Sequence, residues 1–200
     1  MQSFRAGQKI VILDTSDSFT REAILQNLSA GGDDHAKALA DQFITENVTF
    51  HKVEELGVPV DLLNLQYPSV PETKHKIIDA IVSAHIQNMG KVQKAALRTG
   101  ISDLMENQSI NMIDLYERLT DSSMSDSLVM QFEDMLSCFL EYDSSDRSWD
   151  EFFDDSKGII VISTDAVSCS SGSALVDMLL MSLFYAQRNN PTQHIAVFID

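Results

Sequence analysis

The chain has 200 residues, of which 44% are hydrophobic and 8% aromatic, and it carries a formal net charge of −16. This hydrophobic content is typical of a globular protein and excludes a disordered one, and the length allows one core that carries a large insertion. The most apolar stretch, residues 174–186, contains Asp177 and is shorter than the ~20 residues that a membrane helix needs. No secretory signal follows Met1. We therefore expect a cytoplasmic protein without membrane contact, with Cys138 and Cys169 as reduced thiols.

The negative charge is concentrated in residues 101–157, where fifteen Asp and Glu stand against Arg118, Arg147 and Lys157, leaving −12. Affinity for nucleic acids comes largely from Lys and Arg that displace counterions from phosphates. We therefore expect this segment not to bind DNA. The first interpretation is a solvated acidic surface that keeps the chain soluble, and the alternative is docking onto a basic partner.

The first third of the chain indicates α/β structure. Lys9–Asp14 is a continuous apolar run that ends in an acid, which is typical of a parallel strand covered on both faces. The segments expected after it are a turn over 15–18, a helix over 19–28 with Phe19, Ala23, Ile24 and Leu28 inward, a helix over 34–47, a strand over 48–53 and an extended segment over 58–65.

The middle of the chain is predicted to be helical. Apolar residues at helical spacing indicate helices over 71–89, 92–105, 112–119 and 127–142, the last with Leu128, Phe132, Met135, Leu136, Phe139 and Leu140 inward. Ser148 and Glu151 have the spacing of a capping box. We expect them to open a short helix that buries Trp149, Phe152 and Phe153.

The sheet pattern returns in the last quarter. Residues 158–163 form a predicted buried strand, and the polar turn 170–173 is expected to cap a helix over 174–187 that is apolar nearly all round, Phe184 included, and so sandwiched. Residues 195–200 form a last buried strand that ends in Asp200. A strand–helix–strand order at each end predicts one parallel sheet carrying a large helical insertion, with Asp14 and Asp200 at the same edge.

This order of segments resembles the FtsK–HerA superfamily of hexameric ATPases that translocate DNA or protein, in particular its HerA-type and conjugative-transfer members. The resemblance is carried by the strand ending at Asp14, the extended segment 57–63, the helical stretches 89–97 and 111–119, the strand 157–162, the helix ending in Arg188 and the strand ending at Asp200. It implies a partial P-loop-type α/β fold, with ATPase-core parts at 1–70 and 154–200 and a helical insertion at 71–153.

The resemblance also implies roles for three residues. Asp200 corresponds to the Walker B aspartate, which holds Mg²⁺ of Mg-ATP through water. Asp14 corresponds to the acid that ends the strand after the P-loop helix, a candidate for nucleotide or partner contact, and Arg188 is a candidate trans-acting arginine. The glutamate that often follows the Walker B aspartate is not in the sequence.

No Gly-x-x-x-x-Gly-Lys-[Ser/Thr] occurs in the 200 residues, so the phosphate-binding loop of such an ATPase is missing. We expect a fragment of a motor ATPase that is inactive alone, whose parent forms a homo-hexamer with Mg²⁺ and ATP. The fragment's partner is then the remaining ATPase core, and any DNA is contacted outside it. The alternative is a non-catalytic α/β interaction or regulatory domain whose acidic helical block binds a partner.

Other chemistry is disfavoured by residue spacing. The five histidines, at positions 35, 51, 75, 85 and 194, show no metal-ligand spacing. The acidic stretch 143–155 lacks the alternating ligands and glycine of an EF-hand. Residues 168–173 contain no Gly-x-Ser-x-Gly, so a helix cap is preferred there over a nucleophile.

Overall fold

A computed structural model describes most of the two ends of the chain and part of its middle. The described residues are 8–62, 76, 82, 84, 86, 90–95, 99, 113–114, 116–117, 126–143, 145–167, 169–190 and 194–200. The helices predicted over 71–89, 92–105 and 112–119 lie largely outside these residues, so the division into a core and an insertion at 71–153 stays a prediction. No helix in the described ranges is both long enough and apolar enough to cross a membrane.

The helices and strands whose bounds the structure gives lie mostly where the sequence predicts them. In chain order they are β1 (Lys9–Asp14), α1 (Arg21–Leu28), α2 (Asp34–Asn47), β2 (Val48–Lys52), α3 (Val53–Leu56), α7 (Asp126–Glu141), α8 (Trp149–Asp154), β3 (Ile159–Ser163), α9 (Cys169–Asn189) and β4 (Ile195–Ile199). Side chains cap three of the helices because their first N–H groups need acceptors. Thr20 caps α1, Asp33 caps α2, and Ser148 forms the predicted capping box with Glu151.

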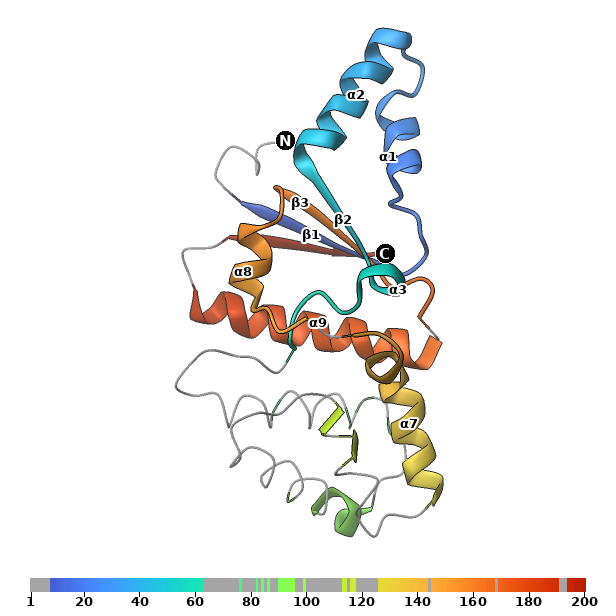
Figure 1. Cartoon of the computed structure of the whole chain (residues 1–200), viewed down its shortest axis with the longest axis vertical. Helices are drawn as coiled ribbons and strands as arrows, with labels where there is room; N and C mark the ends of the chain where they lie inside the picture. Colours follow the sequence, from blue (N-terminus) through green and yellow to red (C-terminus); the bar gives the residue numbers. More distant parts are fainter. Residues whose placement is uncertain are drawn as a thin grey trace.

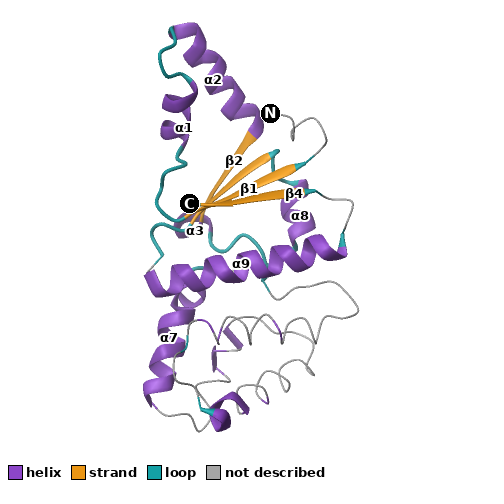
Figure 2. Ribbon diagram, turned by 180° about the vertical axis from the view of Figure 1, so that it is seen from behind, coloured by secondary structure: helices purple, strands orange, loops and turns teal. Residues whose placement is uncertain are grey.

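The four strands form one parallel sheet in the order β2-β3-β1-β4. β1 occupies a central position, pairing with β3 on one side and β4 on the other. The carboxyl ends of all the strands therefore meet at one edge, close to the C-terminus of the chain (Figure 2). The prediction of an α/β fold built on a parallel sheet is confirmed.

Helices cover both faces of this sheet, as Figure 1 shows. On one face lie α1 and α2, where Ile44 forms a small core with Val48 and Val161. On the other face lie α8 and α9, and the main core includes Val11 and Leu13 of β1. Alternate residues of a strand point to opposite faces, so Ile12 packs against the α1–α2 side while its neighbours pack against α9. The central strands β1 and β3 are therefore covered on both sides by helical crossovers.

The last strand differs from its prediction. Residues 195–200 were expected to be buried, but β4 is an edge strand, and Phe198 and Ile199 are 57% and 58% exposed. The register pairs Phe198 with Ile12 and Ile199 with Leu13, so the two side chains point to opposite faces of the sheet. The apolar residues at the carboxyl end of β4 are thus uncovered on both faces, whereas Ile195 at its start is buried in the main core.

Several local predictions are also corrected. Residues 170–173 are not a turn but lie within α9, which begins at Cys169. Phe184 of α9 is exposed rather than sandwiched, as are Leu28 of α1 and Leu140 of α7, each predicted to point inward. The short helix α3 follows β2 directly and was not predicted.

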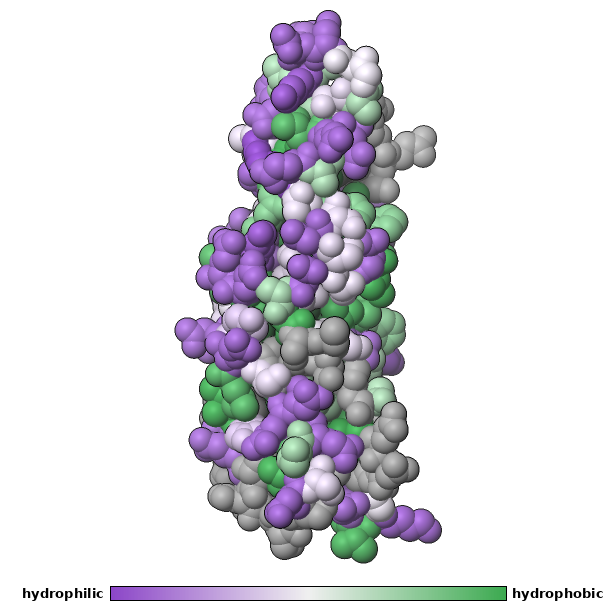
Figure 3. All heavy atoms as spheres, turned by 90° about the vertical axis from the view of Figure 1, so that its right-hand side faces the viewer, coloured by the Kyte–Doolittle hydropathy of each residue, from purple (hydrophilic) through white to green (hydrophobic). Residues whose placement is uncertain are grey.

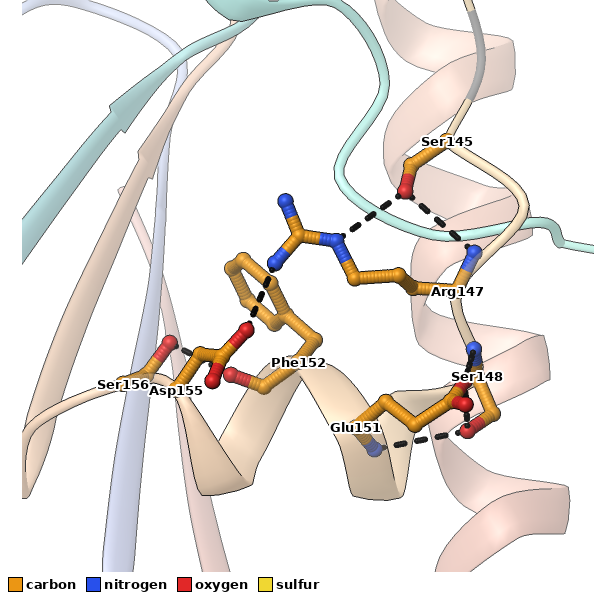
Figure 4. Close-up of polar contacts among 7 residues, drawn as sticks. All are labelled: Ser145, Arg147, Ser148, Glu151, Phe152, Asp155 and Ser156. Atoms are coloured by element: carbon orange, nitrogen blue, oxygen red, sulfur yellow. Dashed lines mark hydrogen bonds and ion pairs between the residues drawn. The ribbon is translucent and has the colours of Figure 1, made fainter.

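Backbone hydrogen bonds join two segments that are far apart in the sequence, residues 58–61 and 143–147. Val58 N donates to Asp143 O at 2.8 Å, Ser145 N to Val58 O at 3.0 Å, and Asp61 N to Arg147 O at 2.9 Å. Arg147 is fixed in turn, because its guanidinium bonds the Ser145 hydroxyl and forms an ion pair with Asp155 at 3.1 Å (Figure 4). These contacts join the extended segment after α3 to the start of α8.

Candidate functional site

The candidate site lies at the carboxyl edge of the sheet, in the loops that follow β1 and β3 and at the end of β4. The chain leaves β1 toward α1 on one face of the sheet and leaves the adjacent β3 toward α9 on the other face. In open α/β sheets, ligands bind at such a switch point outside the carboxyl ends of the strands. Figure 3 shows this side of the molecule, with hydrophilic residues prevailing over the α1–α2 end.

Asp14, the last residue of β1, is almost fully buried at 1% exposure. Its carboxylate accepts hydrogen bonds from three backbone N–H groups of the following loop: Ser16 at 3.2 Å, Ser18 at 3.1 Å and Phe19 at 2.8 Å. Asp17, inside this loop, has a positive φ of 57°, a conformation that Asp adopts more readily than most residues. The buried carboxylate therefore orders the loop between β1 and α1.

Asp200, directly after β4, lies beside this loop. Its N–H donates to Leu13 O at 3.0 Å, and its carbonyl accepts from the Thr15 hydroxyl at 2.5 Å. The Ser16 hydroxyl donates to Asp200 Oδ2 at 2.5 Å, and Ser18 Oγ lies 2.6 Å from Ser16 Oγ. Asp200 itself is exposed. The structure thus brings two sequence-predicted site residues, Asp14 and Asp200, to opposite sides of one short loop.

Two cavities open at this edge. One of about 430 Å³ lies between Thr15, the loop after β3 and the first turns of α9. It is lined by Thr164, which is 4% exposed and whose hydroxyl has no hydrogen-bond partner. The other, of about 320 Å³, lies between the loop after β1 and the end of β2, and Asp14, Arg21 and Lys52 are among its lining residues.

The residues at this edge fit a hydrated metal ion better than they fit nucleotide phosphates. Mg²⁺ is bound in proteins through one or two carboxylates and retained water, and the exposed carboxylate of Asp200 meets that need. The nearby cations are already engaged by acids: Arg21 pairs with Asp41 at 2.8 Å, and Lys52 lies within 4 Å of Glu54 and Glu55. No cluster of three metal-ligating side chains occurs in the part of the chain that the structure describes.

The third predicted residue, Arg188, lies elsewhere. It stands in the last turn of α9, whose end precedes the amino end of β4, and its side chain is exposed. Because the strands are parallel, this end of the sheet is opposite the edge that carries Asp200. The structure does not bring Arg188 and Asp200 of one chain together.

The sequence did not single out the hydroxyl residues of the site. Thr15, Ser16 and Ser18 were recognised only as turn residues, and Thr164 was not noted. An acid at a strand end followed by Ser at the second and fourth positions is a usable signal, since Asp side chains commonly accept from backbone N–H groups two residues on.

Comparison with protein-family models gives no match, and neither does comparison with curated proteins. Among solved structures, the chain is similar to VirB4 of Thermoanaerobacter pseudethanolicus, with a TM-score of 0.57 and 10% sequence identity. The similarity covers 98% of this chain and 54% of that one, so the chain spans about half the length of the protein it resembles. At this identity the likeness shows the fold alone: a partial α/β fold with a parallel sheet of the P-loop type.

Proposed function

We propose that this chain is the Walker B part of a motor ATPase core of the FtsK–HerA type. In this proposal Asp200 places Mg²⁺ through its water shell, and the phosphate-binding loop comes from the rest of the protein. The observation that carries the proposal is the position of Asp200, whose exposed carboxylate ends a strand at the carboxyl edge of an all-parallel sheet. VirB4, a P-loop ATPase of the FtsK–HerA type, has the similar fold.

The open edge of the sheet supports the proposal that the remaining ATPase core packs against β4. Edge strands that end a sheet are usually protected by charges, prolines or bulges, whereas β4 consists of Ile195, Ala196, Val197, Phe198 and Ile199. Its last three apolar side chains, those of Val197, Phe198 and Ile199, are exposed, as expected of a strand that is internal once a further strand and covering helices are added. We assign this position to the part of the core that carries the phosphate loop.

The finer assignments rest on the resemblance of the segment order. In these assignments the parent protein is a cytoplasmic homo-hexamer that uses Mg²⁺ and ATP to move DNA or protein. Arg188 of one subunit would then reach the nucleotide site of a neighbouring subunit. The charge of −12 over residues 101–157 favours contact with DNA, where it occurs, outside this chain, because phosphates are repelled by like charge.

The experiment is a steady-state ATPase assay of the full-length protein, its Asp200→Ala and Asp200→Asn variants, and the 200-residue chain alone. We expect Mg²⁺-dependent turnover by the full-length protein, a loss of at least about 100-fold in both variants since the metal position is lost, and no turnover by the chain alone. Asp134→Asn, which removes an exposed acid from α7, is the matched control and is expected to keep wild-type turnover.

Two outcomes contradict the proposal. Turnover that survives Asp200→Ala shows that Asp200 does not place the metal. A full-length protein that neither binds nor hydrolyses ATP favours the other class of function, an interaction domain whose acidic helical block binds a partner.

A further inference from the structure

The loop after β1 lies between two acidic residues, one buried and one exposed. Asp14 is buried beneath the loop and Asp200 is exposed beside it. Three backbone N–H groups donate to the Asp14 carboxylate, two to Oδ1 and one to Oδ2. Such an arrangement fixes residues 16–19 without using their side chains, which leaves the hydroxyls on the outer side of the loop available for other contacts.

Those hydroxyls are directed at Asp200. The Thr15 hydroxyl donates a hydrogen bond to the backbone carbonyl of Asp200, and the Ser16 hydroxyl donates one to the Asp200 carboxylate oxygen Oδ2, both at 2.5 Å. Ser18 Oγ lies 2.6 Å from Ser16 Oγ, so Ser18 can donate to Ser16 while Ser16 donates to Asp200. The backbone of Asp200 is also tied to β1 through Leu13 O. One carboxylate oxygen is thereby held by the protein, and no described residue donates to the other, Oδ1.

We propose that Ser16 is a positioning residue for Asp200, and that Asp14 fixes the conformation of the loop that carries Ser16. This inference rests on the proposed function, in which Asp200 holds the water shell of Mg²⁺. A hydrogen bond to Oδ2 fixes the rotation of the carboxylate and directs Oδ1 toward the metal's water ligands. Groups that orient a metal-binding carboxylate in this way commonly contribute 10- to 100-fold in metal affinity or activity.

The choice of a hydroxyl has a chemical reason. A neutral donor leaves the carboxylate its full negative charge, whereas a lysine or arginine at position 16 would compete with the cation for it. The loop conformation has its own cost, because Asp17 adopts a positive φ, and strained residues of this kind persist where the surroundings hold them. Here the holding group is the buried carboxylate of Asp14.

The test uses the full-length protein and measures two quantities. One is the affinity for Mg²⁺, by calorimetric titration in the presence of a non-hydrolysable ATP analogue, which we expect Ser16→Ala to weaken. The other is ATPase turnover against free Mg²⁺ at saturating ATP. For Ser16→Ala we expect the half-saturating Mg²⁺ concentration to rise about tenfold, with turnover recovering substantially at high Mg²⁺. Ser16→Thr keeps the hydroxyl and is expected to restore the wild-type Mg²⁺ dependence. Ser127→Ala, which changes an exposed serine in the first turn of α7, is the control and is expected to leave that dependence unchanged.

A second variant tests the role of the loop. Asp14→Asn keeps the size of the side chain but weakens the three N–H contacts, and we expect a rise in the Mg²⁺ requirement in the same direction as for Ser16→Ala. Thermal unfolding of each variant is followed in parallel by circular dichroism. If Asp14→Asn fails to fold, Ser16→Ala and its threonine rescue still decide the question.

The outcomes separate this inference from the proposed function. If Asp200→Ala has wild-type turnover, the proposed function fails. If Asp200→Ala is inactive while Ser16→Ala keeps the wild-type Mg²⁺ requirement, Ser16 does not position Asp200 and the inference is overturned. It is likewise overturned if Ser16→Ala lowers turnover equally at all Mg²⁺ concentrations, or if threonine does not rescue it.

Discussion

Gly57 lies directly against the backbone of Asp143, so that a Cβ added at residue 57 would stand 2.1 Å from the Asp143 carbonyl oxygen. The same carbonyl accepts a hydrogen bond from Val58 N at 2.8 Å. Gly57 also has φ 77° and ψ −174°, a region of backbone conformation that essentially only glycine adopts. The pairing of the segment after α3 with the loop between α7 and α8 therefore requires glycine at this position.

Gly57→Ala is expected to destabilise the fold by at least about 3 kcal/mol, because backbone strain and a steric clash each contribute on the order of 1–3 kcal/mol. The matched control is Gly31→Ala. Gly31 also has a positive φ, 74°, but no atom lies within 4 Å of its added Cβ, so only the conformational cost of about 1 kcal/mol remains. Urea unfolding of both variants measures the difference. Equal destabilisation would show that the contact with Asp143 is absent.

Trp149, the single tryptophan of the chain, reports on the packing of α8 against α9. Its indole N–H donates to Ser182 Oγ at 2.9 Å, and both side chains are buried. Ser182→Ala leaves the indole N–H without an acceptor, which we expect to cost about 1–3 kcal/mol. Chemical denaturation followed by tryptophan fluorescence measures this.

The double variant Trp149→Phe with Ser182→Ala, followed by circular dichroism, is the control. Removing both partners leaves no unsatisfied donor, so its loss of stability should be smaller than the sum of the two single losses. Additive losses would argue against the hydrogen bond.

The sequence predicted the strands β1, β2 and β3, the helices α2, α7 and α8, and the common edge of Asp14 and Asp200, because these depend on local patterns. A continuous apolar run such as residues 10–13 indicates a central parallel strand, and Ser148 with Glu151 indicates a helix start. The environment of β4 was beyond such reasoning: its apolar run is that of an internal strand, whereas its exposure depends on which strands stand next to it.

The residues at the carboxyl edge of the sheet likewise divide into those that a local sequence pattern predicts and those that depend on the strand order. Asp200 was identified from its place at a strand end, but the contact between Ser16 and Asp200 joins residues 184 positions apart. Such a contact depends on the strand order, which places β1 beside β4. The start of α9 was misplaced for a different reason: its serine-rich first turns have the composition of a loop, and the packing of Ala174 and Leu175 in the core outweighs that local preference.

Lys9 is expected to stabilise the junction between β1 and α8. Its ammonium donates to the carbonyl oxygens of Phe153 and Ser156, both at 2.6 Å, which lie at and beyond the C-terminal end of α8, where backbone carbonyls lack helical partners. Burial lowers the pKa of Lys9, and the nearby Asp154 opposes this effect. Lys9→Met should cost about 1–3 kcal/mol in urea unfolding, since bonds from a charged donor are stronger than neutral ones.

Lys37→Met is the control for this prediction. Lys37 is an exposed residue of α2, and its replacement is expected to change stability by less than about 0.5 kcal/mol. A similar, small effect of both substitutions would mean that the Lys9 contacts contribute nothing to the folded state.

His51 is expected to make the stability depend on pH near neutrality. The side chain is buried, its Nε2 lies 2.8 Å from Gly57 O, and its ring meets Phe152 edge to face at 5.6 Å. Burial lowers the pKa of His51 below its ordinary value of 6.5; the hydrogen bond to Gly57 opposes this shift, and the charge of Arg147 adds to it. The folded protein therefore holds His51 neutral at pH values where the unfolded chain already binds a proton.

The sign of the effect follows from this difference. Above pH 6.5 His51 is neutral in both states and contributes no pH dependence; as the pH falls through 6.5 toward the lowered pKa, the unfolded state takes up more protons and the free energy of unfolding decreases. We expect His51→Gln, which keeps a side-chain amide able to donate to Gly57 O but does not titrate, to abolish this contribution. Urea unfolding at intervals from about pH 7.5 to 5.5 compares wild type, His51→Gln and the exposed control His35→Gln. Wild type and His35→Gln should lose stability more steeply over this range than His51→Gln, and parallel curves for all three proteins would show that His51 is not held neutral by the fold.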